Sequence, residues 1–290
     1  MTVHATTEAT TAVGHPDDVF VGTTLASWTV KARIASSAHA TVFRVERDGC
    51  VGAFKLYRTT VDPFAIERGR REAMALSRVS HRAIAPLLEA GTVLDDAPYV
   101  VTSWIDGTLL SDRLAGGPMP WAELHPILIA ICDGLIAVHG AGVVHRDLKP
   151  TNLIIPRGEN PAAIILDLGH ALIAGDDRIT QSGLAIGSVS FMAPEQAVGH
   201  RADPRSDLYA VGAILYRALT GHPVFVGTTA EVLQAHATTA IVAPRSRAPE
   251  LAIPREAEDL CLWLLAKNPA ERVPSATVLA VTLSVVSRSR

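Results

Sequence analysis

The first third of the chain contains short runs in which hydrophobic and polar residues alternate, the pattern of β-strands with one buried face. Asp48-Gly49 joins two of these runs and is typical of a tight hairpin turn at positive φ. Asp62-Pro63 is typical of a helix start, with Pro63 as first helical residue, and the stretch up to Ser80 has amphipathic helical spacing. The pattern predicts an antiparallel sheet with one helix, and its strands cover 29–47 as two runs, then 50–57, 87–92 and 99–103.

Beyond Gly107 the hydrophobic residues take up helical spacing. Trp121 to His139 shows this spacing throughout and is predicted to be a largely buried helix. A strand-rich half followed by a helix-rich half predicts an α+β fold of two lobes, joined near Trp104 to Gly107 around a ligand cleft. The remaining predicted elements are helices at 206–219, 229–237, 255–266 and 275–287 and short strands at 153–155 and 164–166.

The sequence divides into a leader and one domain. Residues 1–25 are rich in Thr, Ala and His without hydrophobic periodicity, so a flexible leader without chemistry of its own is predicted there. Residues 26–286 are predicted to form the domain, with an N-terminal lobe at about 26–104 and a C-terminal lobe at about 107–286.

The composition is that of a globular protein, with 48% hydrophobic residues among 290 and a formal net charge of −3. Such near-neutrality gives no support to a nucleic-acid or anionic-membrane partner. Cys50, Cys132 and Cys261 are far apart and odd in number, so we expect buried reduced thiols rather than disulfides or a zinc site. We find no secretion signal and no 18 consecutive hydrophobic residues, which predicts a cytoplasmic protein without a membrane span.

Three motifs follow one another in the second half of the chain. The first is His145-Arg146-Asp147-Leu148-Lys149-Pro150-Thr151-Asn152. The second is Asp167-Leu168-Gly169, and the third is Ala193-Pro194-Glu195. In these motifs the chain resembles the eukaryotic-type serine/threonine protein kinases, most closely those of bacteria, over residues 26–286. The resemblance implies the bilobal protein-kinase fold, with ATP bound between a small β-rich lobe and a larger helical lobe. It also implies transfer of the γ-phosphoryl group to Ser or Thr hydroxyls of proteins, including the kinase itself.

Roles for the charged residues follow from the resemblance. Asp147 would accept or orient the hydroxyl proton, and Lys149 would neutralise the transferring phosphoryl group. Lys149 also indicates serine/threonine specificity. Lys55 would contact the α- and β-phosphates and pair with Glu72 of the predicted helix, with Glu67 as the competing candidate.

Asn152 and Asp167 are the implied metal ligands, because their hard oxygen atoms suit Mg²⁺ or Mn²⁺ beside ATP phosphates. Leu168 replaces the family's phenylalanine and is expected to keep its apolar packing. Glu195 is expected to form a buried ion pair with Arg272.

Three further expectations concern the activation segment and its surroundings. Asp207 would brace the backbone of His145-Arg146. Arg146 would receive a phosphate on Thr180 or Ser182, whose charge-assisted hydrogen bonds would order the segment. Ser188 would bridge the catalytic aspartate and lysine, near the segment that seats the peptide.

The chain departs from the family at the glycine-rich loop. The family pattern is Gly-x-Gly-x-x-Gly-x-Val, and the aligned residues here are Ala35-Ser36-Ser37-Ala38-His39-Ala40-Thr41-Val42. Side chains at left-handed positions cost roughly 1–2 kcal/mol each, so a raised requirement for ATP is expected. Glycine at 35, 37 and 40 should then lower the KM for ATP. The amides of 36–40 are still expected to reach the phosphates, and His39 is either a phosphate contact or an exposed residue without a role.

The resemblance also assigns the adenosine contacts. Asp112 is either a ribose contact or a solvated helix-start residue. The adenine would meet backbone groups of Ser103, Trp104 and Ile105, with Thr102 behind the pocket and Ile34, Val42, Ala53 and Leu153 around the ring.

Two other functions stay open at this point. The missing glycines motivate a pseudokinase, which would bind nucleotide and act as a scaffold or allosteric partner. An antibiotic phosphotransferase shares the fold, but lacks the Lys149-Pro150 pair and the peptide-seating segment at 193–195. For the kinase, the predicted partners are proteins with Ser or Thr acceptors, and a second copy of the chain for autophosphorylation.

Overall fold

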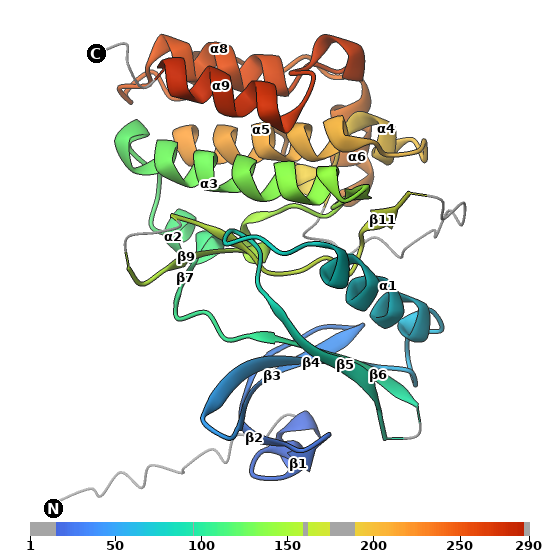
Figure 1. The fold of residues 1–290 in the computed structure, drawn as a ribbon. Helices are drawn as coiled ribbons and strands as arrows, with labels where there is room; N and C mark the ends of the chain where they lie inside the picture. The colour runs from blue at the N-terminus through green and yellow to red at the C-terminus, as the bar shows by residue number, and fades with distance from the viewer. Residues whose placement is uncertain (1–15, 95, 159–161, 175–188, 287–290) are drawn as a thin grey trace, which may run out of the picture.

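The chain folds into a strand-rich and a helix-rich lobe, as the hydrophobic patterns predicted (Figure 1). The computed structural model describes residues 16–94, 96–158, 162–174 and 189–286. In Figure 1 the blue and teal strands form the lower lobe, and the green to red helices form the upper lobe. The predicted α+β, bilobal architecture is confirmed.

The N-terminal lobe contains a six-stranded antiparallel sheet of order β1-β2-β3-β4-β6-β5. Alternation along its strands buries Phe43 and Phe54 in a small core, while Lys55 points to the opposite face. The β3–β4 turn has φ of 50° at Asp48 and 78° at Gly49, the two positive values that the predicted hairpin requires. The strands are β1 (Thr24–Leu25), β2 (Trp28–Ser36), β3 (Ala40–Arg47), β4 (Cys50–Tyr57), β5 (Leu87–Val93) and β6 (Ala97–Ser103).

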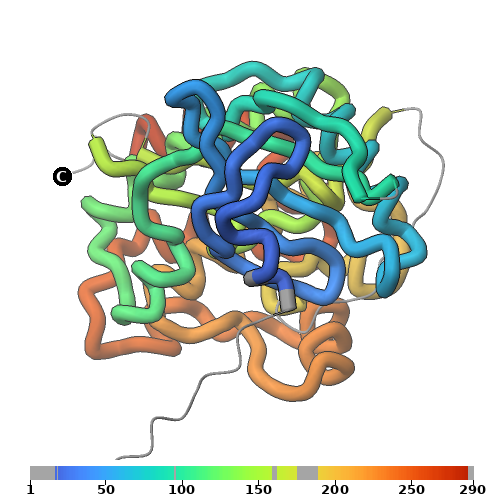
Figure 2. The backbone as a smooth tube through the Cα atoms, turned by 90° about the horizontal axis from the view of Figure 1, so that it is seen from below, coloured from blue at the N-terminus to red at the C-terminus, as the bar shows by residue number. Residues whose placement is uncertain are grey.

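A short segment before the sheet is part of this lobe. The 3₁₀-helix η1 (Pro16–Phe20) precedes β1, and the Phe20 ring packs edge-on against Phe43 with centroids 5.9 Å apart. In Figure 2 the dark-blue segment crosses in front of the blue strands. The prediction of a loosely ordered leader is therefore wrong for 16–25, because Phe20 and Leu25 join the sheet's core. Residues 1–15 lie outside the described ranges.

Helix α1 (Ala65–Arg78) lies between the sheet and the helical lobe (Figure 1). It begins two residues later than predicted, because the Asp62 carboxylate accepts the Phe64 N–H at 2.9 Å and holds Pro63 in the preceding turn. Ala75 and Leu76 are buried in the main core, so the predicted amphipathic face is confirmed.

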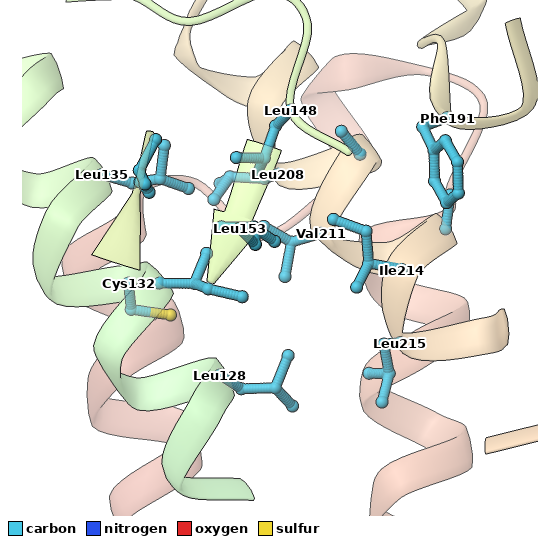
Figure 3. Packing of buried hydrophobic residues seen from close by; sticks show 14 of the residues in the cluster. Leu128, Cys132, Leu135, Leu148, Leu153, Phe191, Leu208, Val211, Ile214 and Leu215 are labelled. Carbon is cyan, nitrogen blue, oxygen red and sulfur yellow. The ribbon is translucent and has the colours of Figure 1, made fainter. Parts of the chain in front are cut away.

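The C-terminal lobe is arranged around α3 (Trp121–Gly140) and α5 (Pro204–Thr220). Figure 3 shows their facing residues with those of the catalytic segment between them: Leu128, Cys132, Leu135, Leu148, Leu153, Leu208, Val211, Ile214 and Leu215. The other helices are α2 (Leu110–Ala115), α4 (Pro194–Ala197), α6 (Thr229–Thr238), α7 (Pro244–Arg247), α8 (Arg255–Leu264), α9 (Ala276–Val286), η2 (Pro150–Asn152), η3 (Val189–Phe191) and η4 (Pro269–Glu271). Short strands form a three-stranded sheet of order β10-β9-β7 and the pair β11-β8: β7 (Gly107–Leu109), β8 (Val143–Val144), β9 (Leu153–Pro156), β10 (Ile164–Ile165) and β11 (Leu172–Ile173).

Helix α3 is the predicted buried helix. By length and composition alone it could cross a membrane, but half of its most hydrophobic window is buried inside the fold. Its hydrophobicity is therefore explained by core packing. Cys132 and Cys261 are buried free thiols, whereas Cys50 is exposed, so the expected burial is wrong for Cys50. This residue is the first of β4, directly after the hairpin turn, where no neighbouring element covers it.

Candidate active site

The catalytic segment runs from β8 through η2 to β9, at the edge of the C-terminal lobe. The Lys149 Nζ lies 2.6 Å from Asp147 Oδ2, so the two predicted catalytic residues form an ion pair. The Asn152 Nδ2 donates to the Asp147 carbonyl oxygen at 2.9 Å. This bond fixes the amide and leaves its side-chain oxygen available for another ligand.

The backbone of this segment is held by a buried carboxylate, as predicted. Asp207 accepts the His145 N–H at 2.9 Å and the Arg146 N–H at 2.8 Å. Arg146 has a φ of 68°, a left-handed conformation that costs a non-glycine residue about 1–3 kcal/mol. Burial alone would raise the pKa of Asp207, but bonds from His139 and from the backbone lower it. The ionised carboxylate therefore offsets the strain beside the catalytic aspartate.

Lys55 reaches into the cleft from β4 and contacts two carboxylates. Its Nζ lies 3.0 Å from Glu72 Oε2 and 2.8 Å from Asp167 Oδ2. The predicted Lys55–Glu72 pair is thus present, while the competing Glu67 pairs with Arg71 on the same helix at 3.1 Å. The contacts bring together residues from β4, α1 and the segment after β10.

The charges of Lys55 and Asp167 stabilise each other's ionised state. Burial alone would lower the pKa of Lys55, but Asp167 and Glu72 raise it well above its usual value. Burial would raise the pKa of Asp167, but Lys55 and the Gly169 amide hold it far below its usual range. Burial and the Asp167 charge raise the pKa of Glu72 to about 7. At neutral pH Lys55 is therefore a cation and Asp167 an anion.

The two predicted metal ligands fit a hard divalent cation by their chemistry. Asp167 accepts the Gly169 N–H at Oδ1, at 2.6 Å, and the carboxylate is ionised. A Cβ on Gly169 would lie 2.9 Å from that oxygen and 3.0 Å from Lys55 Nζ, so a side chain there would displace one of these two groups. With the Asn152 side-chain oxygen, Asp167 provides oxygen donors of the kind that Mg²⁺ prefers beside phosphates. Leu168 is fully buried in the main core, which confirms its expected packing.

The chain connecting the lobes carries the predicted adenine contacts. The backbone N–H of Ser103 donates to the Pro86 carbonyl at 2.9 Å, and that of Trp104 donates to the Val51 carbonyl at 3.0 Å. Within the described residues the Ile105 N–H donates no hydrogen bond, so it is available to a ligand. Thr102 is buried behind this segment, as expected for its position.

Leu153 is not part of this pocket, and its predicted contact with the ring is wrong. The residue is fully buried among the α3 and α5 side chains of Figure 3. Ile154 lies on the opposite face of β9 and packs with Ile105 of the connection. Since strand residues alternate, the predicted strand at 153–155 presents Leu153 and Ile154 on opposite faces, and Ile154 was the available alternative. Three other predicted ring contacts, Ile34, Val42 and Ala53, keep some exposed surface on β2, β3 and β4.

The loop that replaces the glycine-rich loop is the β2–β3 hairpin. The structure describes all of residues 34–42, and none of them has a positive φ. The expected left-handed strain is therefore absent from this loop. His39 is not an exposed residue without a role, because it is half-buried and its Nδ1 lies 3.1 Å from Asp62 Oδ2, whereas its contact with a phosphate stays a prediction. Asp112 is exposed at the start of α2, with its predicted ribose contact untested.

The predicted structural ion pair is also present. Arg272 forms two bonds to Glu195, of 2.8 and 2.6 Å, and its side chain is fully buried. Thr180, Ser182 and Ser188 lie outside the described residues, so the expectations for them stay predictions.

Two residues of the site were missed from the sequence. The Tyr57 hydroxyl donates to the Glu72 carboxylate, and its ring centroid lies 5.2 Å from Lys55 Nζ. Tyr57 lies two residues after Lys55 on β4, so both side chains are on the same face of the strand. This spacing could have identified Tyr57 from the sequence. His170 follows Gly169, and burial lowers its pKa to about 4, so the imidazole is neutral at pH 7.

Comparisons with known proteins agree with this geometry. The protein kinase domain family matches residues 28–282. Serine/threonine-protein kinase pkn3 of Myxococcus xanthus is 36% identical over 289 residues, which cover 95% of this chain and 53% of that protein. PknL of Mycobacterium tuberculosis is 34% identical over 89% of this chain and 65% of its own length, and PknB of Mycobacterium leprae is 34% identical over 83% and 39%. This chain belongs to the protein kinase family. It spans between about two fifths and two thirds of these relatives' lengths.

Proposed function

We propose that this protein is an ATP-dependent serine/threonine protein kinase. The observation that carries the proposal is Lys55 bridging Glu72 and Asp167 near the Asp147–Lys149 pair, since the charges of both Asp147 and Asp167 act on His170. This arrangement offers a cation for the α- and β-phosphates, an oxygen site for a metal ion and a carboxylate for the acceptor hydroxyl. The names of the relatives support serine and threonine as acceptors.

The chemistry assigned to the site is in-line transfer of the γ-phosphoryl group. The acceptor hydroxyl oxygen forms a bond to the γ-phosphorus while the bond to the leaving ADP oxygen breaks. Asp147 orients the hydroxyl and takes its proton, and Lys149 stabilises the charge on the transferring group. A divalent cation held by Asn152 and Asp167 would neutralise phosphate charge when bound. The missing glycines motivate the pseudokinase alternative, but the presence of Lys55, Glu72, Asp147, Asn152 and Asp167 supports the enzyme.

A phosphate switch on the activation segment is part of the proposal. The Arg146 Nε is buried and has no hydrogen-bond partner among the described residues. Burial and the nearby Arg71 charge lower the pKa of Arg146, so an anion arriving there would relieve the repulsion. Autophosphorylation on Thr180 or Ser182, within a transient homodimer, would supply that anion. A cytoplasmic location, where ATP and reduced cysteines are found, belongs to the same proposal.

The test is incorporation of radiolabelled γ-phosphate into the protein and into a generic basic acceptor, with Mg²⁺ or Mn²⁺. Lys55→Met and Asp167→Asn should each abolish incorporation while the protein still folds, as shown by a single cooperative unfolding transition. Lys31→Met is the control, because Lys31 pairs with Glu46 at 3.3 Å on the exposed sheet surface. Incorporation above the no-enzyme background in either site variant would refute the assignment. Magnesium-independent nucleotide binding with no transfer would favour the pseudokinase.

A further inference from the structure

The nucleotide loop closes on itself through a serine side chain. The Ser37 N–H donates to the Ala40 carbonyl at 2.9 Å, closing the hairpin. The Ser37 Oγ accepts the N–H groups of His39 and Ala40, at 3.2 and 3.1 Å. The N–H groups of Ser37, His39 and Ala40 are therefore engaged within the loop, and these bonds hold the loop in one shape.

Both arms of this hairpin are held by one guanidinium group. Arg58 Nη2 donates to Ser36 Oγ at 2.6 Å and to Thr41 Oγ1 at 3.0 Å. The backbone N–H of Arg58 also donates to the carbonyl of His39 at the loop tip, at 2.8 Å. A single residue just after β4 thus contacts the loop at both arms and at the tip.

A carboxylate from the N-terminal segment completes this cluster. Asp17 pairs with Arg58 Nη2 and accepts the Thr41 hydroxyl at 2.5 Å. The side chains of Asp17 and Arg58 are 20% and 29% exposed, so the pair is shielded enough to exceed an ordinary surface ion pair. The bonds are charge-assisted and act on opposite arms, which restricts how far the hairpin can open.

A second tie joins the loop tip to the helix of the cluster. His39 Nδ1 lies 3.1 Å from Asp62, whose buried carboxylate lies 2.9 Å from Arg68 Nε on α1. Arg68 Nη1 in turn lies 3.4 Å from the His170 ring, one residue after Gly169. The loop, α1 and the metal-ligand segment are consequently linked through polar side chains.

We propose that Arg58 is a positioning residue for the nucleotide phosphates in this kinase. Arg58 holds the glycine-free loop in one conformation before the nucleotide binds. This preorganisation takes the place of the close approach of backbone to phosphates that glycine allows. The inference rests on the proposed function, since it requires ATP in the cleft. It predicts that loss of Arg58 weakens binding of the triphosphate but not of the nucleoside.

Arg58→Ala is therefore expected to raise the Kd for Mg-ATP about tenfold, as for one lost charge-assisted interaction, and the KM in parallel, with kcat within about twofold. The Kd for adenosine, which has no phosphates, should stay unchanged. Arg47→Ala is the matched control, because Arg47 lies on the same sheet, is 33% exposed and pairs with Glu89 at 2.6 Å. Its Kd for Mg-ATP should remain within about twofold of wild type. Titration calorimetry gives the dissociation constants directly, whereas KM equals Kd only when chemistry is slow.

Two further variants keep the proposal testable if Arg58→Ala fails to fold. Ser36→Ala combined with Thr41→Val removes the hydroxyl ties, leaves the Asp17 pair and should raise the Kd for Mg-ATP severalfold. Glycine at 35, 37 and 40 should also raise it, because Ser37 can no longer close the loop. A fall after the glycine change would overturn the proposal and support the strain expected from the sequence.

The remaining outcomes separate the two proposals. A wild-type protein that binds no Mg-ATP overturns the proposed function, and the inference with it. If the wild type binds Mg-ATP and Arg58→Ala binds it with the same Kd, only the inference is overturned. Equal weakening of adenosine and Mg-ATP also overturns it, because the residue would then support the fold rather than the phosphates.

Discussion

Arg272→Met tests the buried ion pair of the C-terminal lobe. All five donors of the Arg272 guanidinium are used: two on Glu195, and one each on the carbonyls of Ala266, Arg205 and Lys267. The distances run from 2.6 to 3.1 Å. Methionine matches the length of the aliphatic stem but provides no donor, so the variant leaves the Glu195 charge without its partner.

Burial sets the expected magnitude. Removing one partner of a buried pair costs about 3–5 kcal/mol, because the other charge remains out of water. An exposed pair contributes about 0–1 kcal/mol. Arg113 and Glu123 also form a pair with two bonds, at 2.6 and 2.7 Å, but their side chains are 27% and 43% exposed. Arg113→Met is therefore the matched control for burial.

Calorimetric unfolding measures the difference. At roughly 2–4 °C per kcal/mol, Arg272→Met should lower the melting temperature by about 6–20 °C and Arg113→Met by at most about 4 °C. Adding Glu195→Gln to Arg272→Met should recover part of the loss, since no unpaired charge remains. Equal shifts for the two arginine variants would refute the reasoning that burial decides the cost.

The same pair predicts a pH dependence. Burial alone would raise the pKa of Glu195, but hydrogen bonds from Arg272 and Ser206 lower it below its usual value. Its stabilisation is therefore complete above the unfolded-state pKa of about 4.3 and is lost as the pH falls through the lower folded-state pKa. The stability difference between wild type and Arg272→Met should shrink over that acidic range. A difference that stays constant there would contradict the assignment to an ionised Glu195.

Two further predictions concern activity. The Thr180→Ala, Ser182→Ala double variant should start with lower kinase activity than wild type, and mass spectrometry after incubation with ATP should find phosphate in this segment. If other sites fill while the segment stays unmodified, the Arg146 switch is wrong. Tyr57→Phe removes the bond to Glu72 and should lower kcat/KM about tenfold, whereas Tyr99→Phe, which loses a similar bond to Glu89 at 2.6 Å, should not. Equal effects of the two tyrosine variants would mean that Tyr57 only supports the sheet.

The contacts of the catalytic cluster could be predicted because each role requires one residue type at a fixed place in the order of elements. Lys55 follows a hairpin and precedes an amphipathic helix, which identified it. The spacing to the turn at His81 favoured Glu72 over Glu67, and Lys55 Nζ lies 3.0 Å from Glu72. The Asp207 brace and the Glu195–Arg272 pair were predicted by the same resemblance and are confirmed.

The ties of the nucleotide loop could not be predicted, because they join residues without any local pattern. Arg58 and Asp17 are 41 positions apart, and His39 and Asp62 are 23 apart. Asp17 also lies in a segment whose composition indicated disorder, although Phe20 nearby packs against the sheet. The absence of glycine was visible from the sequence, but the serine and arginine contacts that accompany it depend on the folded hairpin.

The position of α1 follows from contacts at three points of the site. Glu72 binds Lys55 of the sheet, Arg68 pairs with Asp62 beneath the loop, and the same arginine reaches His170 after the metal-ligand motif. Because burial keeps the His170 imidazole neutral at pH 7, this last contact is a hydrogen bond from the guanidinium rather than a repulsion between cations. An outward movement of α1 would break all three contacts together. The helix therefore couples the shape of the loop to the placement of Asp167, the predicted metal ligand, although no residue of α1 is assigned a direct contact with the transferred phosphate.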